Sequence, residues 1–425
     1  IYTSDVFSKP SVKDKTLGLE LTLTNPGEPT TVTLRNEIVP WNEGRGGAVE
    51  LRFPDKLLEL GANDSETLDI IAAWPDPHLW WPDDPHLYCV ETTIRINDRA
   101  IDTRRTRFGF REWDWSTHMF KLNGVKWPMW ADLSSHGKAP PVQVEMAKTS
   151  HQNHMRYWHT GGLGEMTRRE ALDHFDQTGM LVRSSGTFDG QRANYGGGLS
   201  ERDLSQPAGE NRRPPRKAKT VLFDNWRKQM TAWIKEERNH PSIYIWSVEN
   251  EITYINANNL GQSEQVEPAI RDSILHVMKT DPTRPAMVDG GNALRDESLP
   301  VNGAHYTEFM NADFRDFPDA AYTREHYYDP DRPQRGAWRL VPDRPIMGGE
   351  IYFANGYGTE RFATIGGDAC FIGMGETMRA RGLWGKMLSE GYRWCEYASF
   401  QFWMGNADTS YWNIWSPVAV FCEQN

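Results

Sequence analysis

Apolar and polar residues alternate along the first quarter of the chain, a pattern typical of strands with one buried face. Residues 17–24 read Leu-Gly-Leu-Glu-Leu-Thr-Leu-Thr, and a turn sequence of Asn, Pro and Gly follows. Similar alternation recurs at residues 31–34, 50–53, 67–71 and 91–96, with turn residues in between. Short strands at this spacing predict an immunoglobulin-like β-sandwich over residues 1–112.

A different pattern begins near residue 113, where short apolar runs alternate with helical periodicity. One run, residues 243–248, is β-branched and aromatic without polar alternation, as expected of a strand buried on both faces. Pro241 separates it from the helical segment before it, and Glu249, Asn250 and Glu251 follow it. Such strands form parallel sheets covered by helices, and ligands bind at their carboxyl ends. This cluster of acid and amide groups is therefore the first candidate for a functional site.

Residues 239–251 read Asn-His-Pro-Ser, a strand containing Trp-Ser, and then Asn-Glu. This order resembles the acid/base signature of glycoside hydrolase family 2, the group of β-galactosidases, β-glucuronidases and β-mannosidases. Residues 80–88 and 107–112 resemble the end of the sandwich domain that precedes the catalytic barrel in that family. The resemblance covers most of the chain and implies a glycoside hydrolase with a sandwich followed by a barrel.

The second part is expected to be a (β/α)8 TIM barrel over residues 113–415, a strand count that the resemblance partly guides. The eight strands are expected at residues 127–131, 153–157, 180–182, 243–248, 285–289, 301–306, 345–350 and 398–403. Helices are expected at residues 142–149, 167–178, 221–238 and 267–280. The Gly-, Pro- and Arg-rich segment after the third strand is expected to be a loop over the site. Residues 416–425 look like the start of a further β domain or a tail.

Glycosidases cleave with two carboxyl groups, one that protonates the leaving oxygen and one that attacks the anomeric carbon or activates water. The resemblance implies Glu251 as the acid/base and Glu350, at the end of the seventh strand, as the nucleophile. In a retaining enzyme the two groups lie about 5 to 5.5 Å apart. Glu249 is the alternative acid, and Glu308 and Glu376 are alternative nucleophiles that follow an apolar strand less directly.

Polar and aromatic residues at the other strand ends are expected to bind the sugar. The resemblance implies that Asn250 contacts the 2-hydroxyl and that Arg156 braces the nucleophile; an inward arginine also needs a carboxylate partner. The complete set of expected substrate-binding residues is Asn250, His136, His159, Arg156, Tyr306, Trp403 and Arg183. A purely structural role stays open for both histidines, and core packing stays open for Trp403.

Two strand ends depart from the family pattern. Residues 183–186 read Arg-Ser-Ser-Gly where the family often has an acidic pair, and residues 133–137 read Leu-Ser-Ser-His-Gly in place of Asn-Arg-His-Glu. Both changes fall where substrate hydroxyls or metals would bind, so neither a metal requirement nor a galactose preference is carried over. We expect no metal and no cofactor.

Composition narrows the partners. A net charge of −11 argues against nucleic acid, because phosphate binding requires a basic face. No apolar run is long enough to span a membrane, and the 4 cysteines lack the spacing of a zinc site. The chain begins at Ile1 without a signal peptide, so we expect an internal piece of a longer protein. The compartment stays open, with a periplasmic or secreted location favoured, and a homo-oligomer is possible.

Three functions follow from these patterns. The first is a retaining exo-acting β-glycosidase that hydrolyses O-glycosidic bonds of oligo- or polysaccharides by double displacement. The second is a non-catalytic carbohydrate-binding member of the same fold. The third is a β-glycosidase for acidic fragments, uronic or sulfated, which Arg183 and the basic residues 212–217 would recognise.

Overall fold

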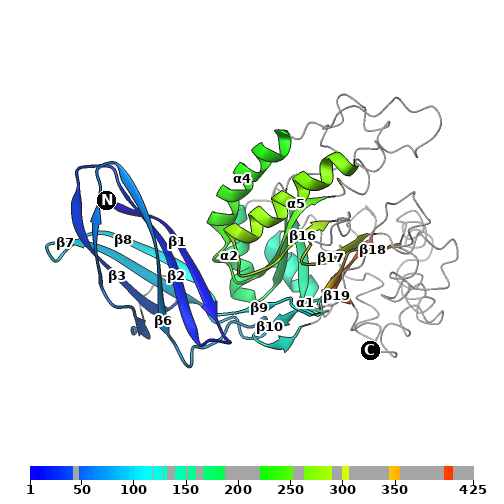
Figure 1. Cartoon of the computed structure of the whole chain (residues 1–425). Helices are drawn as coiled ribbons and strands as arrows, with labels where there is room; N and C mark the ends of the chain where they lie inside the picture. The colour runs from blue at the N-terminus through cyan, green and yellow to red at the C-terminus, as the bar shows by residue number, and fades with distance from the viewer. Residues whose placement is uncertain are drawn as a thin grey trace.

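Two bodies of secondary structure follow one another along the chain in the computed structural model (Figure 1). The structure describes residues 1–41, 47–117, 119–127, 129–131, 139–149, 152–158, 166–186, 221–250, 252, 263–289, 299–305, 344–354 and 397–404. The expected loop over the site and the expected tail at residues 416–425 lie outside these residues.

The first body is a β-sandwich made of two antiparallel sheets. One sheet has the order β1-β2-β6, and the other has the order β4-β3-β7-β8 with β5 paired to β3. The strands are β1 Tyr2–Ser11, β2 Thr16–Asn25, β3 Thr30–Pro40, β4 Leu51–Arg52, β5 Lys56–Leu60, β6 Asp64–Ala73, β7 Tyr88–Ile96 and β8 Arg99–Phe108. Leucines 17, 19, 21 and 23 of β2 point into the core between the sheets, which confirms the alternation as a buried face.

Three strands of the sandwich were not predicted from the sequence: β1, β5 and β8. The strand β8 reads Arg-Ala-Ile-Asp-Thr-Arg-Arg-Thr-Arg-Phe and buries only its last residue, Phe108. It lies at the edge of its sheet, so its apolar signal is weak. Its placement depends on pairing with β7, which a local pattern does not reveal.

A small antiparallel sheet links the two bodies. It consists of β9 Trp113–Asp114, β10 Lys121–Leu122 and β11 Val125–Lys126, in the order β11-β10-β9. These strands lie in the segment that we assigned to the barrel, ahead of its first strand.

The second body is built from eight parallel strands, as predicted. They form two hydrogen-bonded sheets, β12-β19-β18-β17 and β13-β14-β15-β16. The strands are β12 Met129–Ala131, β13 His154–Trp158, β14 Leu181–Ser185, β15 Ile243–Asn250, β16 Ala286–Asp289, β17 Asn302–His305, β18 Ile346–Ala354 and β19 Tyr397–Met404. The sheets meet where β12 contacts β13 and β16 contacts β17, which gives the ring order of a TIM barrel.

Gly303 allows one of these seams to form. A Cβ atom at this position would lie 2.5 Å from the carbonyl oxygen of Val288, so any side chain would push β17 away from β16. The sequence does not reveal the role of this glycine, because the contact joins two strands of different hydrogen-bonded sheets.

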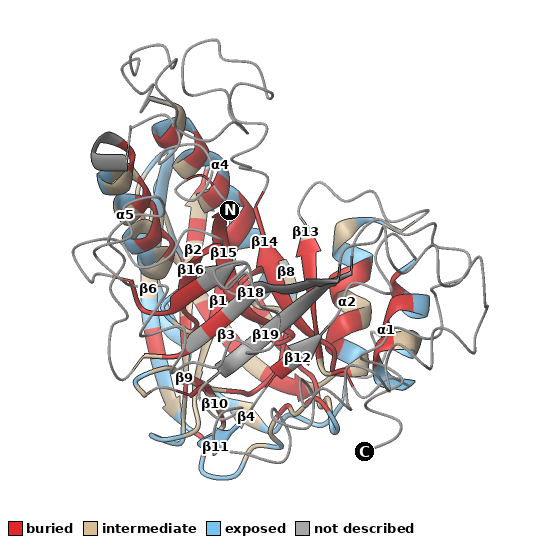
Figure 2. Cartoon of the chain, turned by 90° about the vertical axis from the view of Figure 1, so that its right-hand side faces the viewer, coloured by how far each residue is buried: buried red, intermediate tan, exposed pale blue. Residues whose placement is uncertain are grey.

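The helices lie against the outside of the strands, and the strands β13 to β16 are buried almost throughout (Figure 2). They are α1 Pro140–Thr149, α2 Arg168–Thr178, α4 Val221–Glu237 and α5 Ser263–Thr280. In α2, Thr167 and Glu170 form a capping box, and Gly179 ends the helix at φ 71°, which confirms the predicted stop. Among the described residues, no helix has the length and apolar character needed to cross a membrane.

Three barrel strands continue two or more residues past their expected ends. The strand β15 continues to Asn250 instead of stopping at residue 248, so Glu249 and Asn250 lie within it. The strand β14 continues to Ser185 instead of stopping at residue 182, and all five of its residues are buried. The strand β18 continues to Ala354, so Glu350 lies within it and not at its end. Polar and small residues can continue a buried barrel strand because its hydrogen bonds come from the neighbouring strands.

The sandwich packs against the amino end of β15. The buried guanidinium group of Arg111 donates to the carbonyl oxygens of Pro241 and Ile243 at 3.3 and 3.4 Å. Asn239 accepts from the backbone N–H of Ser8 at 2.9 Å and donates to the carbonyl oxygen of Val6 at 2.7 Å. The two motifs that carry the family resemblance, residues 107–112 and 239–242, therefore meet at this interface.

Candidate active site

The strand β15 carries the motif that the sequence singles out. All of its residues from Ile243 to Asn250 are buried, as predicted for a strand enclosed on both faces. Helices α4 and α5 flank it in the chain, and Asn250 lies at its carboxyl end. Glu251 follows directly but lies outside the described residues.

The side chain of Asn250 meets Arg156, the central residue of β13. The Nη2 atom of Arg156 donates to Oδ1 of Asn250 at 2.6 Å, and both side chains are buried. These two residues were expected at one site, and the structure brings them together from strands that are two places apart in the sheet.

Arg156 has the carboxylate partner that its burial requires. Its Nη2 atom lies 3.0 Å from Oδ2 of Asp289, the last residue of β16, and both side chains are 0% exposed. Its Nε atom donates to Oγ of Ser185 at 3.0 Å, and its guanidinium group stacks 3.8 Å from the ring centre of Trp158. The direction of this arginine is therefore set by three different strands.

Asp289 also binds Arg183, which lies beside Arg156 in the register of β13 and β14. The Nη1 atom of Arg183 is 3.4 Å from Oδ1 of Asp289, and Oγ of Ser247 donates to Oδ2 at 3.0 Å. Asp289, Ser185 and Ser247 were not singled out in the sequence. The signal available for Asp289 was its place at the end of the predicted fifth strand, together with the need of an inward arginine for a carboxylate.

Glu249, the alternative acid, is buried and turned toward the backbone. Its Oε2 atom accepts from the N–H of Ile252 at 2.6 Å, which ties Ile252 back to the end of β15. The side chain is 1% exposed. In this position Glu249 stabilises the backbone at Ile252.

The remaining predicted residues are described only in part. Glu251, His136, His159 and Tyr306 lie outside the described residues. For Glu350 and Trp403 only the backbone is described, within β18 and β19. The backbone of Glu350 is in register with His305, the last residue of β17, so it lies level with that strand's carboxyl end.

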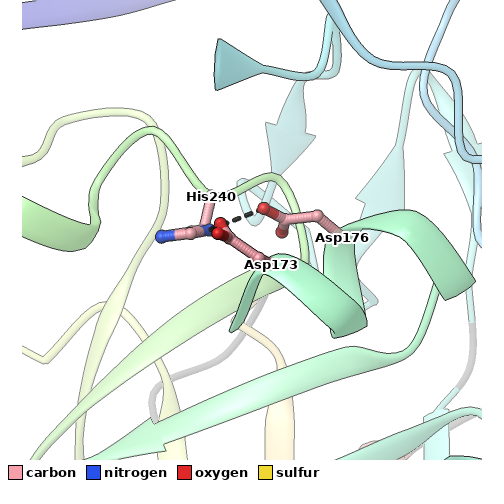
Figure 3. A group of neighbouring side chains, drawn as sticks. All are labelled: Asp173, Asp176 and His240. Carbon is pink, nitrogen blue, oxygen red and sulfur yellow. Dashed lines mark hydrogen bonds and ion pairs between the residues drawn. The ribbon is translucent and has the colours of Figure 1, made fainter. Parts of the chain in front are cut away.

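A second cluster of ionisable residues lies at the opposite, amino end of β15. Asp173 and Asp176 of α2 face His240, as Figure 3 shows, and Nδ1 of His240 is 2.5 Å from Oδ2 of Asp176. Among the described residues this is the group close enough together to hold a metal ion. However, Arg107 of the sandwich pairs with both carboxylates, at 3.0 Å from Oδ2 of Asp176. A guanidinium group thus supplies the positive charge that a metal would bring.

The electrostatics of this cluster favour an ionised Asp176. Burial acts to raise the pKa of its carboxyl group, but the charges of His240 and Arg107 and the hydrogen bonds from His240 and Ser242 outweigh that effect and lower the pKa. The backbone N–H and the hydroxyl of Ser242 donate to Oδ1 at 3.2 and 2.6 Å. Two residues of the Asn-His-Pro-Ser motif, His240 and Ser242, therefore bind the carboxylate of Asp176 in α2, at the base of the barrel.

Comparisons with known proteins agree with this architecture. A putative β-glucuronidase from Formosa agariphila is 27% identical over 244 residues, which cover 55% of this chain and 20% of that protein. A β-galactosidase from Psychromonas ingrahamii is 23% identical over 253 residues, which cover 57% of this chain and 21% of that protein. The chain thus spans about a fifth of the length of these curated relatives.

Solved structures show the same fold. The structure of β-glucuronidase 2 from Bacteroides uniformis, covalently bound to cyclophellitol-6-carboxylate aziridine, matches with a TM-score of 0.62 at 16% identity. The match covers 95% of this chain and 46% of that one. The family model described as Glycosyl hydrolases family 2 matches residues 1–111, and the model of that family's TIM barrel domain matches residues 168–336. Together these two models match more than half of the chain, which therefore belongs to glycosyl hydrolases family 2.

Proposed function

We propose that this chain forms the sandwich and the catalytic barrel of a retaining exo-acting β-glycosidase. The observation that carries the proposal is the placement of Asn250 at the carboxyl end of β15, held there by Arg156. Carboxyl ends of barrel strands are where TIM-barrel enzymes carry out their chemistry. Glu251 is the next residue in the chain. Glu350 lies in β18, and its backbone is level with the carboxyl end of the neighbouring strand β17.

In the first step of this mechanism Glu251 protonates the glycosidic oxygen while Glu350 attacks the anomeric carbon. The bond to the leaving group breaks as a covalent glycosyl-enzyme ester forms. In the second step Glu251 takes a proton from water, which attacks the anomeric carbon and releases Glu350. Asn250 contacts the sugar 2-hydroxyl, an interaction that strengthens in the transition state of such enzymes.

Two supports come from related proteins. The curated relatives carry the names β-glucuronidase and β-galactosidase, both of them glycosidases. One structural neighbour is covalently bound to a cyclophellitol aziridine, as a nucleophilic carboxylate would allow. The substrate of this chain is proposed only as a β-linked oligo- or polysaccharide.

The proposal is tested by hydrolysis of a panel of aryl β-glycosides by the full-length protein that contains this chain. We expect turnover of at least one panel member, and a loss of about a thousandfold or more in kcat for Glu251→Gln and Glu350→Gln. The matched control is Glu59→Gln, the same change at an exposed position of the sandwich strand β5, which should not alter turnover. A folded wild-type protein that binds polysaccharide without turnover would instead support the carbohydrate-binding function.

The same panel separates neutral from acidic sugars. Glucuronides and galacturonides carry a carboxylate, which needs a cationic partner in the site, whereas galactosides and mannosides are neutral. Arg183, the candidate for that partner, is buried and lies against Asp289 in this structure. Preference for a uronide would support the acidic reading, and Arg183→Met would then show whether this arginine contributes to it.

A further inference from the structure

We propose that Asp289 is a positioning residue that orients the Asn250 amide through Arg156. The proposal deepens the proposed function, because it rests on Asn250 contacting the 2-hydroxyl of a β-glycoside. It assigns a role to Asp289, a residue that lies outside the acid/base signature of residues 239–251. The evidence is the buried, hydrogen-bonded chain from Asp289 at the end of β16, through Arg156 in the middle of β13, to Asn250 at the end of β15.

The first step of the argument is the chemistry of Arg156. A guanidinium group only donates hydrogen bonds, so it selects the amide orientation in which Oδ1 of Asn250 faces it. The Nδ2 group, which only donates, then lies on the other side of the amide. An amide fixed in this way offers a hydrogen-bond donor to a sugar oxygen, whereas a flipped amide would offer an acceptor.

The second step is the control of Arg156 by Asp289. Among the partners of Arg156 given by the structure, Ser185 and Trp158 carry no charge, and Asp289 carries the opposite charge. The Nη2 atom that reaches Asn250 is the same atom that lies 3.0 Å from Oδ2 of Asp289. Loss of the carboxylate would therefore act directly on the nitrogen that orients the amide.

The third step is the rigidity of Asp289 itself. Its carboxylate accepts from Oγ of Ser247 on the neighbouring strand and pairs with Arg183, and its side chain is 0% exposed. On β15, two residues lie between Ser247 and Asn250, whereas only one lies between their partners Met287 and Asp289 on β16. This extra residue brings Ser247 and Asn250 to the same face, which regular alternation would not do. The irregularity in β15 thus lets one aspartate serve both residues.

The test compares Asp289→Asn with the wild-type protein on two substrates. These are the aryl β-glycoside of the panel that the wild type hydrolyses fastest and its 2-deoxy analogue. We expect kcat to fall about a hundredfold on the glycoside, as a displaced catalytic contact does, and by less than about threefold on the 2-deoxy analogue. A merely structural defect would slow both substrates equally, and that result would overturn the proposal.

A double-mutant cycle examines the route of the effect. If Asp289 acts through Asn250, the double variant Asp289→Asn with Asn250→Ala should be no slower than Asn250→Ala alone. Multiplied effects of the two changes would overturn the proposal. Asp176→Asn is the matched control, because it makes the same change to another buried aspartate with an arginine partner, at the far end of β15. We expect it to leave the ratio of the two substrates unchanged.

A crystal structure of Asp289→Asn separates this proposal from the proposed function. We expect Nη2 of Arg156 to lie beyond hydrogen-bond distance of Oδ1 of Asn250, farther than about 3.5 Å. A retained contact would overturn the positioning role whatever the activity. A lost contact in a protein whose wild type hydrolyses no panel member would support the positioning role and contradict the glycosidase function.

If Asp289→Asn does not fold, Ser247→Ala takes its place. It removes one hydrogen bond to Asp289 and leaves every charge in place. The expected change is about a threefold loss of kcat on the glycoside with no loss on the 2-deoxy analogue. An equal loss on both substrates, or none on either, would overturn the proposal.

Discussion

The two ends of β15 hold similar groups in different arrangements. At the amino end, Asp176 binds Arg107, His240 and Ser242. At the carboxyl end, Asp289 binds Arg156, Arg183 and Ser247. Each set contains a buried aspartate, at least one arginine, and a serine that lies in β15 or directly before that strand. The difference lies in the elements that supply the partners.

At the amino end the partners come from separate bodies. Arg107 belongs to the sandwich strand β8 and Asp176 to helix α2 of the barrel, so this set joins the two bodies. At the carboxyl end all partners come from four adjacent strands, β13 to β16, and the set leads to Asn250. The same chemical groups thus hold domains together at one end and orient a functional side chain at the other.

The largest effect on stability should come from Asp176→Asn. The change removes the buried carboxylate from the guanidinium group of Arg107 and the ring of His240, and only the partly exposed Asp173 still pairs with them. Removing one partner of a buried ion pair costs about 3 kcal/mol in the free energy of unfolding. Thermal unfolding should show a clearly lower melting temperature, while kcat measured well below that temperature should stay at the wild-type value.

Asp173→Asn is the matched control for this prediction. Asp173 pairs with the same Arg107, but its side chain is 37% exposed. Partly exposed ion pairs contribute at most about 1 kcal/mol, so the control should unfold close to the wild-type temperature. Equal destabilisation by the two variants would show that burial of Asp176 does not determine its contribution.

A smaller effect is expected from pH at the amino end. The pKa of Asp176 in the folded protein lies below its ordinary value of 3.8, because His240, Arg107 and Ser242 outweigh the effect of burial. A carboxylate with a lowered pKa stabilises the fold above its unfolded pKa, and this contribution is lost as the pH falls through the folded pKa. The difference in melting temperature between the wild type and Asp176→Asn should therefore be full at about pH 5 and smaller at about pH 3. A difference that stays constant over this range would contradict the assignment of the lowered pKa to Asp176.

Much of the fold could be predicted from the sequence because its signals are local. The alternation of residues 17–24, the buried run of residues 243–248 and the stop of α2 at Gly179 each appear as predicted. The edge strand β8 and the close approach at Gly303 could not be predicted, because they depend on neighbours distant in the sequence. The end of β18 was misplaced for a similar reason, since its pairing with β19 continues to Ala354.

The candidate site shows the same division. Asn250 and Arg156 could be named from the resemblance, and the structure brings them into contact. Asp289 could have been found only by asking which carboxylate balances a buried arginine, a question of packing across three strands. The motif residues His240 and Ser242 bind Asp176 at the base of the barrel. The signature therefore combines residues for docking the sandwich with residues for the site.

The smallest predicted effect distinguishes the two ends most directly. Ser242→Ala and Ser247→Ala each remove one hydroxyl that donates to a buried aspartate, at 2.6 Å and 3.0 Å respectively. Each change should lower the free energy of unfolding by about 1.5 to 2 kcal/mol, the lower part of the range for a hydrogen bond to a charged group. The backbone N–H of Ser242 still donates to Asp176 in the first variant, which should keep its loss at the lower end. Chemical denaturation of both variants measures these losses.

The kinetic consequences of the two serine variants should differ although their stabilities are similar. Ser247 contacts the aspartate that orients Arg156, so its loss should reduce the preference for a 2-hydroxyl substrate over its 2-deoxy analogue. The hydroxyl of Ser242 donates to Asp176 in the cluster at the interface with the sandwich, so its loss should leave that preference unchanged. If both serines altered the preference equally, the two ends of β15 would be coupled through the strand. The division between docking at one end and orientation at the other would then be wrong.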